Sequence, residues 1–169
     1  MKKDRMFLRQ LAKARANGKE HWGRDFNSDA FFIGLVGEDE FAHQFWNWGV
    51  SVDERILEGG DSGIDSKIGP YTIDVKTYDK AYNLFRETDR TCHADILVLA
   101  QYHAATETAT LLGWEWAIGM LRCPQKRFYN GAPINYYKHN SKLRPMSELK
   151  TFLKIFIPAL DKTPDPVVR

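Results

Sequence analysis

Three aspartates and two lysines lie in the segment GGDSGIDSKIGPYTIDVKTY, residues 59–78. Residues 63–68 and 71–78 are predicted to be two β-strands, because β-branched residues are interspersed with polar ones on either side of a Gly-Pro turn. Successive side chains of a strand point to opposite faces, so Asp74 and Lys76 share a face. The sequence therefore predicts a carboxylate and an ammonium group side by side on one strand.

The Gly-Pro turn also predicts which residues of the two strands face each other. With Gly69 and Pro70 at the centre of the turn, paired residues have numbers that add to 139, and Asp65 and Asp74 satisfy this sum. Directly opposed residues have Cβ atoms about 4.5–5.5 Å apart, where two like charges destabilise the sheet. Two carboxylates placed in this way favour a cation between them.

The chemistry that this carboxylate pair suits is the binding of a hard divalent cation. Carboxylate oxygens, backbone carbonyls and waters are the ligands that Mg²⁺ accepts, often together with a substrate phosphate. A lysine beside such a site can orient or deprotonate a water and can stabilise charge that develops on a phosphoryl group. The alternative is a surface hairpin in which Lys76 only neutralises Asp74.

A third acid comes from the segment FNSDAFFIGLVGEDEFAHQFWNW, which predicts a helix of residues 30–47. On a helical wheel Glu38 falls at the centre of the apolar stripe, whereas Glu40 lies about 200° round, on the side expected to face solvent. A buried acid is costly unless it is paired or binds a metal. Gly34 and Gly37 indicate that another part of the chain approaches the helix closely. We therefore expect Glu38 to face the sheet, with an ordinary buried Glu paired to Arg or Lys as the alternative.

GLVGEDEF followed by GIDSKIGPYTIDVKT resembles the PD-(D/E)xK nuclease superfamily. The similarity consists of a helix Glu after G-x-x-G, an Asp at the end of one strand, and Asp-x-Lys on the next strand, and it extends over about residues 31–117. The resemblance, which is to small microbial or phage nucleases, implies a restriction-endonuclease-like fold of the α/β (α+β) class. In that fold a mixed central β-sheet is flanked by helices.

Carried over residue by residue, the resemblance implies catalytic roles for Glu38, Asp65, Asp74 and Lys76. It implies Glu38 as the helix acid, Asp65 as the first metal ligand, and Asp74 and Lys76 as the Asp-x-Lys pair. The implied metal ligands are Glu38, Asp65, Asp74 and the carbonyl of Val75. The implied cofactor is Mg²⁺, for which Mn²⁺ can substitute, and Lys76 is expected to orient the attacking water.

The elements that must position these groups belong to one nuclease-like domain of residues 1–169, with a core of about residues 28–157. We expect the C-terminal tail, residues 161–169, to be disordered. Periodicity and turn signals predict helices of residues 4–16, 30–47 and 146–157, and strands of residues 50–57, 63–68, 71–78, 94–103, 108–117 and 134–138.

Charge is strongly segregated along the chain although the net charge is only +2. Residues 1–20 contain seven Lys or Arg against two acids, residues 21–120 contain seven against seventeen, and residues 121–154 contain eight against one. An acidic centre with basic surroundings suits a protein that holds both a metal cation and a polyanion, although an unevenly charged solvated surface has the same pattern. The candidates for nucleic-acid binding are Lys126, Arg127, Lys138, Lys142 and Arg144.

Other patterns exclude several classes of protein. No run approaches the roughly 20 apolar residues that span a bilayer, and the N-terminus lacks the apolar region of a secretory signal. The two cysteines and five histidines show no metal-ligand spacing, and two cysteines are too few for a disulfide framework. We therefore expect a soluble protein without a membrane partner, in the cytoplasm or, if it is viral, in the cytoplasm of the host cell.

These observations together predict a Mg²⁺-dependent deoxyribonuclease that hydrolyses phosphodiester bonds of DNA in recombination, repair or phage DNA processing. The alternative is a catalytically silent nuclease-fold module that binds nucleic acid or a protein partner. The sequence leaves open exonuclease or endonuclease action, the preferred DNA structure, and whether the protein is a monomer or a homodimer.

Overall fold

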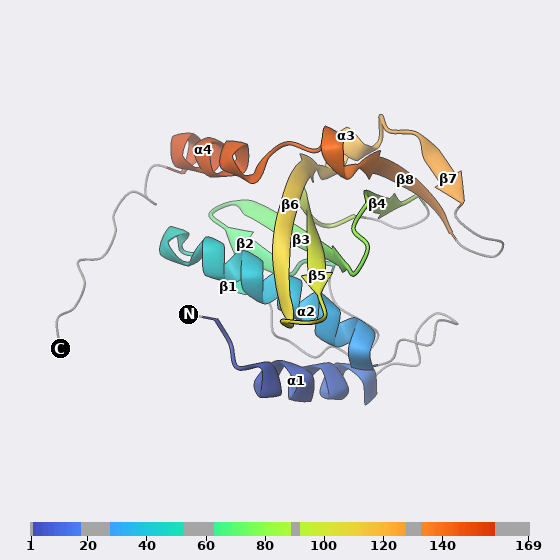
Figure 1. Cartoon of the computed structure of the whole chain (residues 1–169). Coiled ribbons are helices and arrows are strands. Elements are labelled where there is room, and N and C mark those ends of the chain that lie inside the picture. Colours follow the sequence, from blue (N-terminus) through green and yellow to red (C-terminus); the bar gives the residue numbers. More distant parts are fainter. Residues whose placement is uncertain (1, 18–27, 53–62, 89–91, 128–132, 158–169) are drawn as a thin grey trace.

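The computed structural model describes residues 2–17, 28–52, 63–88, 92–127 and 133–157. These residues form a mixed α and β structure in which helices flank a five-stranded sheet and a smaller sheet lies to one side (Figure 1). The predicted α/β (α+β) class is therefore confirmed. No helix in the described part of the chain is long and apolar enough to cross a membrane.

The elements follow the predicted order with several additions. They are α1 (Arg5–Asn17), α2 (Ser28–Gln44), the 3₁₀ helix η1 (Trp46–Trp48), β1 (Ser51–Val52), β2 (Ser66–Ile68), β3 (Tyr71–Tyr78), β4 (Asn83–Glu87), β5 (Ile96–His103), β6 (Thr108–Trp116), α3 (Ala117–Met120), β7 (Gln125–Arg127), β8 (Ile134–His139), η2 (Asn140–Lys142) and α4 (Met146–Phe156).

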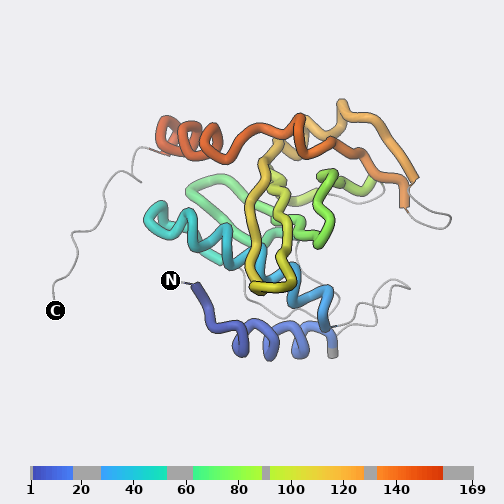
Figure 2. The backbone as a smooth tube through the Cα atoms, viewed as in Figure 1, coloured from blue at the N-terminus to red at the C-terminus, as the bar shows by residue number. Residues whose placement is uncertain are grey.

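The larger sheet has the strand order β1-β2-β3-β5-β6, and the smaller sheet has the order β4-β8-β7. In the larger sheet β3 and β5 are parallel, whereas the other neighbours are antiparallel. The tube in Figure 2 shows α1 and the β7–β8 hairpin at opposite sides of the molecule, with the larger sheet between them. Strand β3 is the centre of this sheet and carries the Asp-x-Lys residues.

The predicted β2–β3 register is confirmed. Ser66 pairs with Ile73 and Ile68 pairs with Tyr71, so the paired numbers add to 139. Gly69 has φ of 56° in the two-residue turn, a conformation that favours glycine. Asp65 lies one residue outside this ladder, and its N–H donates to the carbonyl of Ile73 at 2.8 Å. Asp65 is therefore next to the β2–β3 ladder but is not a paired residue opposite Asp74.

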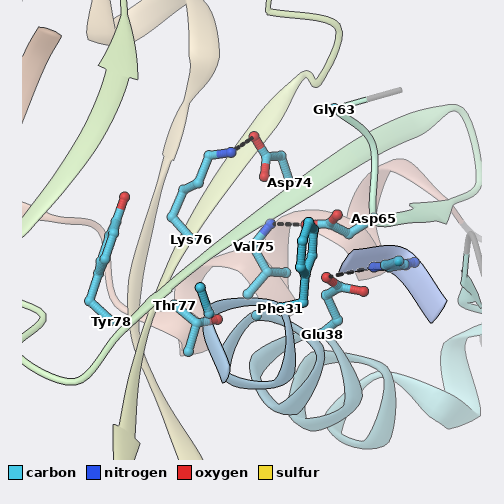
Figure 3. Close-up of a pocket in the computed structure, with 12 residues that line it drawn as sticks. Phe31, Glu38, Gly63, Asp65, Asp74, Val75, Lys76, Thr77 and Tyr78 are labelled. Carbon is cyan, nitrogen blue, oxygen red and sulfur yellow. Dashed lines mark hydrogen bonds and ion pairs between the residues drawn. The ribbon is translucent and has the colours of Figure 1, made fainter. Parts of the chain in front are cut away.

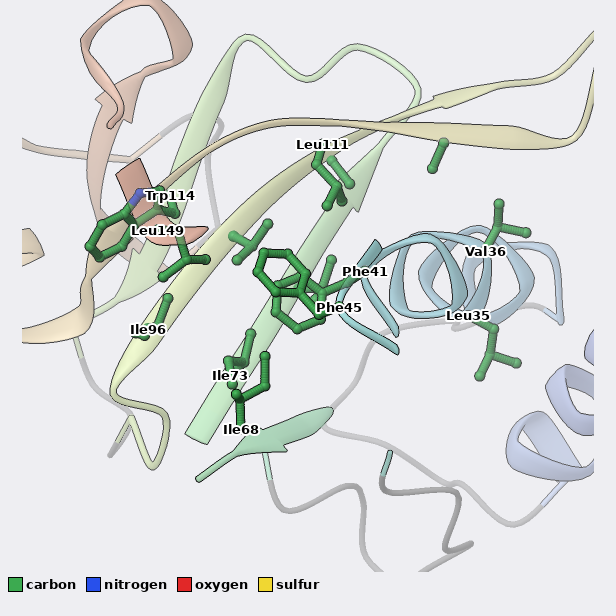
Figure 4. Packing of buried hydrophobic residues seen from close by; sticks show 14 of the residues in the cluster. Leu35, Val36, Phe41, Phe45, Ile68, Ile73, Ile96, Leu111, Trp114 and Leu149 are labelled. Atoms are coloured by element: carbon green, nitrogen blue, oxygen red, sulfur yellow. The ribbon is translucent and has the colours of Figure 1, made fainter. Parts of the chain in front are cut away.

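One face of the larger sheet is covered by α2, which forms the main core with it. Phe41 and Phe45 stack with ring centroids 4.6 Å apart, and their cluster includes Ile68 and Ile73 (Figure 4). Each such buried side chain contributes about 1.5–3 kcal/mol to stability. A Cβ added at Gly37 would lie 1.9 Å from Thr77 Oγ1, which confirms the close approach predicted for this helix.

Helix α1 covers a second side of α2, which the helical wheel does not predict. Leu8 of α1 is buried in the main core, Lys2 pairs with Glu40 at 2.7 Å, and Arg5 pairs with Asp39 at 3.3 Å. The expectation that Glu40 faces solvent is therefore wrong, because its exposed fraction is 9%. The wheel identifies the apolar stripe but not a face that is covered through ion pairs.

The opposite face of the larger sheet carries a second, smaller core. Leu97 and Leu99 of β5 are buried there with Leu84 of β4 and Met120 of α3. The smaller sheet is thereby attached to the larger one through the inner face of β4.

Differences from the predicted elements lie in short segments. Strands β4 and β7 and helix α3 are additional, and the strand expected at 63–68 begins at Ser66. Of the strand expected at 50–57, only Ser51–Val52 is described as strand, and residues 53–57 lie outside the described residues. The tail expected to be disordered, residues 161–169, also lies outside them.

Candidate active site

A pocket of about 200 Å³ lies beside the part of β3 that extends past Ser66 of β2, between β3, α2 and α1 (Figure 3). All of the residues predicted from the motif for catalysis or metal binding line it, and these are Glu38, Asp65, Asp74, Val75 and Lys76. The structure thus brings together residues that are up to 38 positions apart in the sequence.

Asp74 and Lys76 form an ion pair on one face of β3, as predicted. Lys76 Nζ lies 2.8 Å from Asp74 Oδ2, and the Lys76 side chain keeps an exposed fraction of 39%. Burial lowers the pKa of the Lys76 ammonium group, but the negative charges of Asp74 and Asp65 outweigh this effect and raise the pKa above its ordinary value. Lys76 is therefore a fixed positive charge and hydrogen-bond donor at neutral pH.

Asp65 is a buried carboxylate held by the backbone of β3. Its Oδ2 accepts a hydrogen bond from the N–H of Val75 at 2.6 Å. Burial raises the pKa of Asp65 well above its ordinary value, and the charges of Glu38 and Asp74 raise it further. Asp65 is thus within electrostatic reach of both other acids, and a bound cation would relieve their mutual repulsion.

Glu38 comes from the centre of α2 and is paired with Arg15 of α1. The distance between Arg15 Nη1 and Glu38 Oε1 is 3.6 Å, and both side chains are at least nine-tenths buried. The motif does not include Arg15. The sequence does contain a signal for it, because the spacing of Leu8, Ala12 and Arg15 places them on one side of a helix, and all three are buried.

Figure 3 shows that the site extends around the edge of β3. Asp74 and Lys76 project from one face of the strand, whereas Glu38 approaches from the other. Asp65 lies between the two because it directly precedes β2, which begins at Ser66. The N–H and C=O of a strand residue point to the same side, so the Val75 carbonyl points toward the edge where Asp65 accepts the Val75 N–H.

The donor set fits Mg²⁺ or Mn²⁺ in its chemistry, since it consists of carboxylate and carbonyl oxygens. Among the described residues, no three His, Cys, Asp or Glu side chains form a ready-made metal cluster. The three carboxylates instead contact Lys76, the Val75 N–H and Arg15. The residues that would hold the cation are Asp65 and Asp74, with Glu38 and the Val75 carbonyl completing the protein ligands.

The five basic residues predicted to bind nucleic acid separate into two groups, and none of them lines the pocket. Lys126, Arg127 and Lys142 are exposed on β7 and η2. Lys138 forms an ion pair with the buried Glu115, and Arg144 Nε lies 3.5 Å from Glu115 Oε1. Lys138 and Arg144 therefore neutralise an internal acid.

Comparison of the chain with protein-family models, curated proteins and solved structures found no match. The functional argument therefore depends on the motif residues and on the geometry of the pocket that they line.

Proposed function

We propose that this protein is a Mg²⁺-dependent nuclease that hydrolyses phosphodiester bonds of DNA, on a restriction-endonuclease-like fold. The observation that carries the proposal is the convergence of Glu38, Asp65 and Asp74, together with Lys76, in one pocket. The raised pKa of Asp65 supports it, because burial and its two acidic neighbours disfavour the charged form in the absence of a cation.

The arrangement of the sheet supports the fold assignment. The Asp-x-Lys strand is the middle strand of a mixed five-stranded sheet, and the helix with the G-x-x-G-E pattern packs on one face of it. Gly37 of this pattern permits the close contact of α2 with Thr77 of β3. The same contact positions α2 so that Glu38 reaches the pocket.

The chemistry follows from the properties of each side chain. A bound Mg²⁺ would polarise the phosphoryl group and lower the pKa of a bound water. Asp65 and Asp74 would hold the cation, and Glu38 would bind it directly or through water. Lys76 stays protonated and donates hydrogen bonds to the attacking water or to a phosphoryl oxygen. The Val75 N–H fixes the orientation of Asp65.

DNA is the proposed substrate because of the basic residues outside the pocket. Lys126, Arg127 and Lys142 remain candidates for phosphate contacts, since they are exposed. Lys138 and Arg144 are weaker candidates because they already contact Glu115.

A second candidate function is a catalytically silent module that binds nucleic acid or a protein. The observation that favours it is the lack of a ready-made metal cluster among the described residues. The two functions differ in one respect that can be measured, since only the nuclease needs a divalent cation in order to change its substrate covalently.

The decisive experiment is incubation with linear, nicked, branched and single-stranded DNA in Mg²⁺, Mn²⁺, Ca²⁺ or EDTA. We expect cleavage in Mg²⁺ or Mn²⁺, binding without turnover in Ca²⁺, and no cleavage in EDTA. The active-site variant is Asp74→Asn, and its matched control is Asp79→Asn, which is exposed just after β3. Cleavage that persists in EDTA, or that is equal in the two variants, would eliminate the proposed site.

A further inference from the structure

The smaller sheet has an inner face and an outer face with different side chains. Leu84 of β4 and Tyr136 of β8 pack against the second core, so they mark the inner face. Phe85 and Tyr137 are adjacent to these residues in the sequence, and the strand register pairs them with each other. Because successive strand residues alternate in direction, both rings lie on the outer face.

The outer face continues to the candidate active site through Tyr78. Tyr78 lines the pocket together with Lys76. Its ring meets the ring of Phe85 edge to face, with centroids 5.8 Å apart. Tyr78, Phe85 and Tyr137 therefore form a row of three aromatic rings that leads from the pocket across the smaller sheet, called here the aromatic strip.

The strip is more than an extension of the apolar core. All three rings are half-buried. Tyr78 packs against the second core, whereas Phe85 and Tyr137 belong to neither of the two hydrophobic clusters. Polar residues surround them, because Lys126 pairs with Asn135 on the same face as Tyr137. Aromatic rings at a surface beside a cation are typical of sites where unpaired bases stack and the cation contacts the backbone.

Lys126 of β7 is the lysine that the register places on the outer face, whereas Arg127 and Lys138 belong to the inner face. Lys126 is exposed and can therefore contact a phosphate beside the rings. Among the strand residues that the register places on this outer face, Glu87 at the end of β4 is the only acid.

We propose that the aromatic strip binds the unpaired bases of single-stranded DNA and leads that strand to the pocket. This inference rests on the proposed function, since the strip leads the strand toward the residues that are assigned to phosphodiester cleavage. Stacking needs the faces of the bases, which a duplex keeps inside its own stack. The strip therefore selects a single strand, or the unpaired arm of a branched DNA, over an uninterrupted duplex.

The test is a binding measurement in EDTA, in which cleavage does not interfere. Fluorescence anisotropy would compare a labelled single-stranded thymidine oligonucleotide with a duplex of equal length. We expect Tyr137→Leu and Phe85→Leu each to weaken single-strand binding about fivefold or more, with little effect on the duplex. Tyr137→Phe keeps the ring and is expected to bind as the wild type does.

Ile134→Ala is the matched control, because Ile134 is an exposed apolar residue of β8 on the face opposite to Tyr137. Its single-strand affinity is expected to be unchanged. Replacing Lys126 with Gln should reduce the slope of log affinity against log salt by about 0.7 on single strands. Wild-type affinity of the Tyr137→Leu and Phe85→Leu variants for the single strand would overturn the proposal.

A second measurement uses the unaltered protein and so does not depend on the folding of variants. Photocrosslinking to an oligonucleotide that contains 5-iododeoxyuridine, followed by peptide mapping, is expected to label residues of the strip. Crosslinks confined to other surfaces would overturn the proposal. If single strands bind as expected but Mg²⁺ produces no cleavage, the strip stands and the nuclease function fails. If Mg²⁺ produces cleavage but the leucine variants bind single strands as the wild type does, the nuclease function stands and the strip fails.

Discussion

Two clusters of charged side chains, each built around buried acids or a buried acid, differ in how completely the chain neutralises them. Glu115 of β6 is buried, and both Lys138 and Arg144 lie against its carboxylate. Arg144 also pairs with Glu148 of α4. This cluster contains two acids and two cations and links β6, β8 and α4.

The pocket contains three acids, Glu38, Asp65 and Asp74, against Arg15 and Lys76. Among the described residues that line it, the acids therefore exceed the cations by one, and the pKa of Asp65 is raised as a result of burial and of the neighbouring acids. The balanced cluster around the buried Glu115 connects elements of the fold. An acidic excess that opens into a pocket reduces the stability of the metal-free protein and favours a divalent cation.

The largest expected effect separates Glu38 from Glu40 on α2. Glu38→Gln removes a charge from the pocket and should reduce Mg²⁺-dependent cleavage about a hundredfold. The fold should be retained at a lower free energy of unfolding, because the variant loses the ion pair with the buried Arg15. Glu40→Gln loses the pair with Lys2 instead, and it should leave cleavage within about twofold while lowering stability by up to about 1 kcal/mol. Initial cleavage rates and denaturant melts would measure both effects. Full activity of Glu38→Gln would remove this acid from the site.

In the balanced cluster around Glu115, a substitution should lower stability and leave cleavage nearly unchanged. Glu115→Gln leaves Lys138 and Arg144 without their shared counter-charge and should lower the free energy of unfolding by about 2 kcal/mol. Cleavage by the folded variant should stay within about twofold of wild type, because Glu115 is not a pocket residue. Urea unfolding and cleavage rates at a temperature well below the transition would test this. A large loss of activity in the folded variant would mean that the two clusters are functionally coupled.

The pH dependence of stability tests the effect of the excess acid in the pocket. The folded state raises the pKa of Asp65, so the folded state binds this proton more tightly than the unfolded state does. The contribution of Asp65 to the stability of the metal-free protein is therefore greatest at low pH and is lost as the pH rises above about 4 toward its raised pKa.

Asp65→Asn should remove the loss of stability that the ionised Asp65 causes at neutral pH. In EDTA at neutral pH the variant should melt at a higher temperature than wild type, and the difference should shrink as the pH falls toward about 4. Asp79→Asn, an exposed control, should follow the wild-type curve. Scanning calorimetry across this pH range would measure the difference, and a lower melting temperature for Asp65→Asn at neutral pH would contradict the account.

Much of the site could be predicted from local sequence. The Gly-Pro turn determined the β2–β3 register, strand alternation placed Asp74 beside Lys76, and helical periodicity placed Glu38 toward the sheet. These predictions needed only the period of one element or the geometry of one turn.

The remaining features depend on contacts between distant segments. Three ion pairs require tertiary structure, and these are Arg15 with Glu38, Lys2 with Glu40, and Lys138 with Glu115. Strands β4 and β7 are five and three residues long, and the packing of a second sheet decides their conformation more than their own pattern does. The aromatic strip depends on the same packing, so the sequence pattern does not predict it.

The most direct test of the central claim is the melting temperature of the protein as Mg²⁺ or Ca²⁺ is added in place of EDTA. A cation that binds the folded state alone stabilises it in proportion to the logarithm of its concentration above the dissociation constant. The account predicts that both cations raise the melting temperature of wild type and of Glu115→Gln, and that neither raises that of the double variant Asp65→Asn, Asp74→Asn. Equal shifts in the double variant and in wild type, or no shift in wild type, would contradict the claim that the pocket binds a divalent cation.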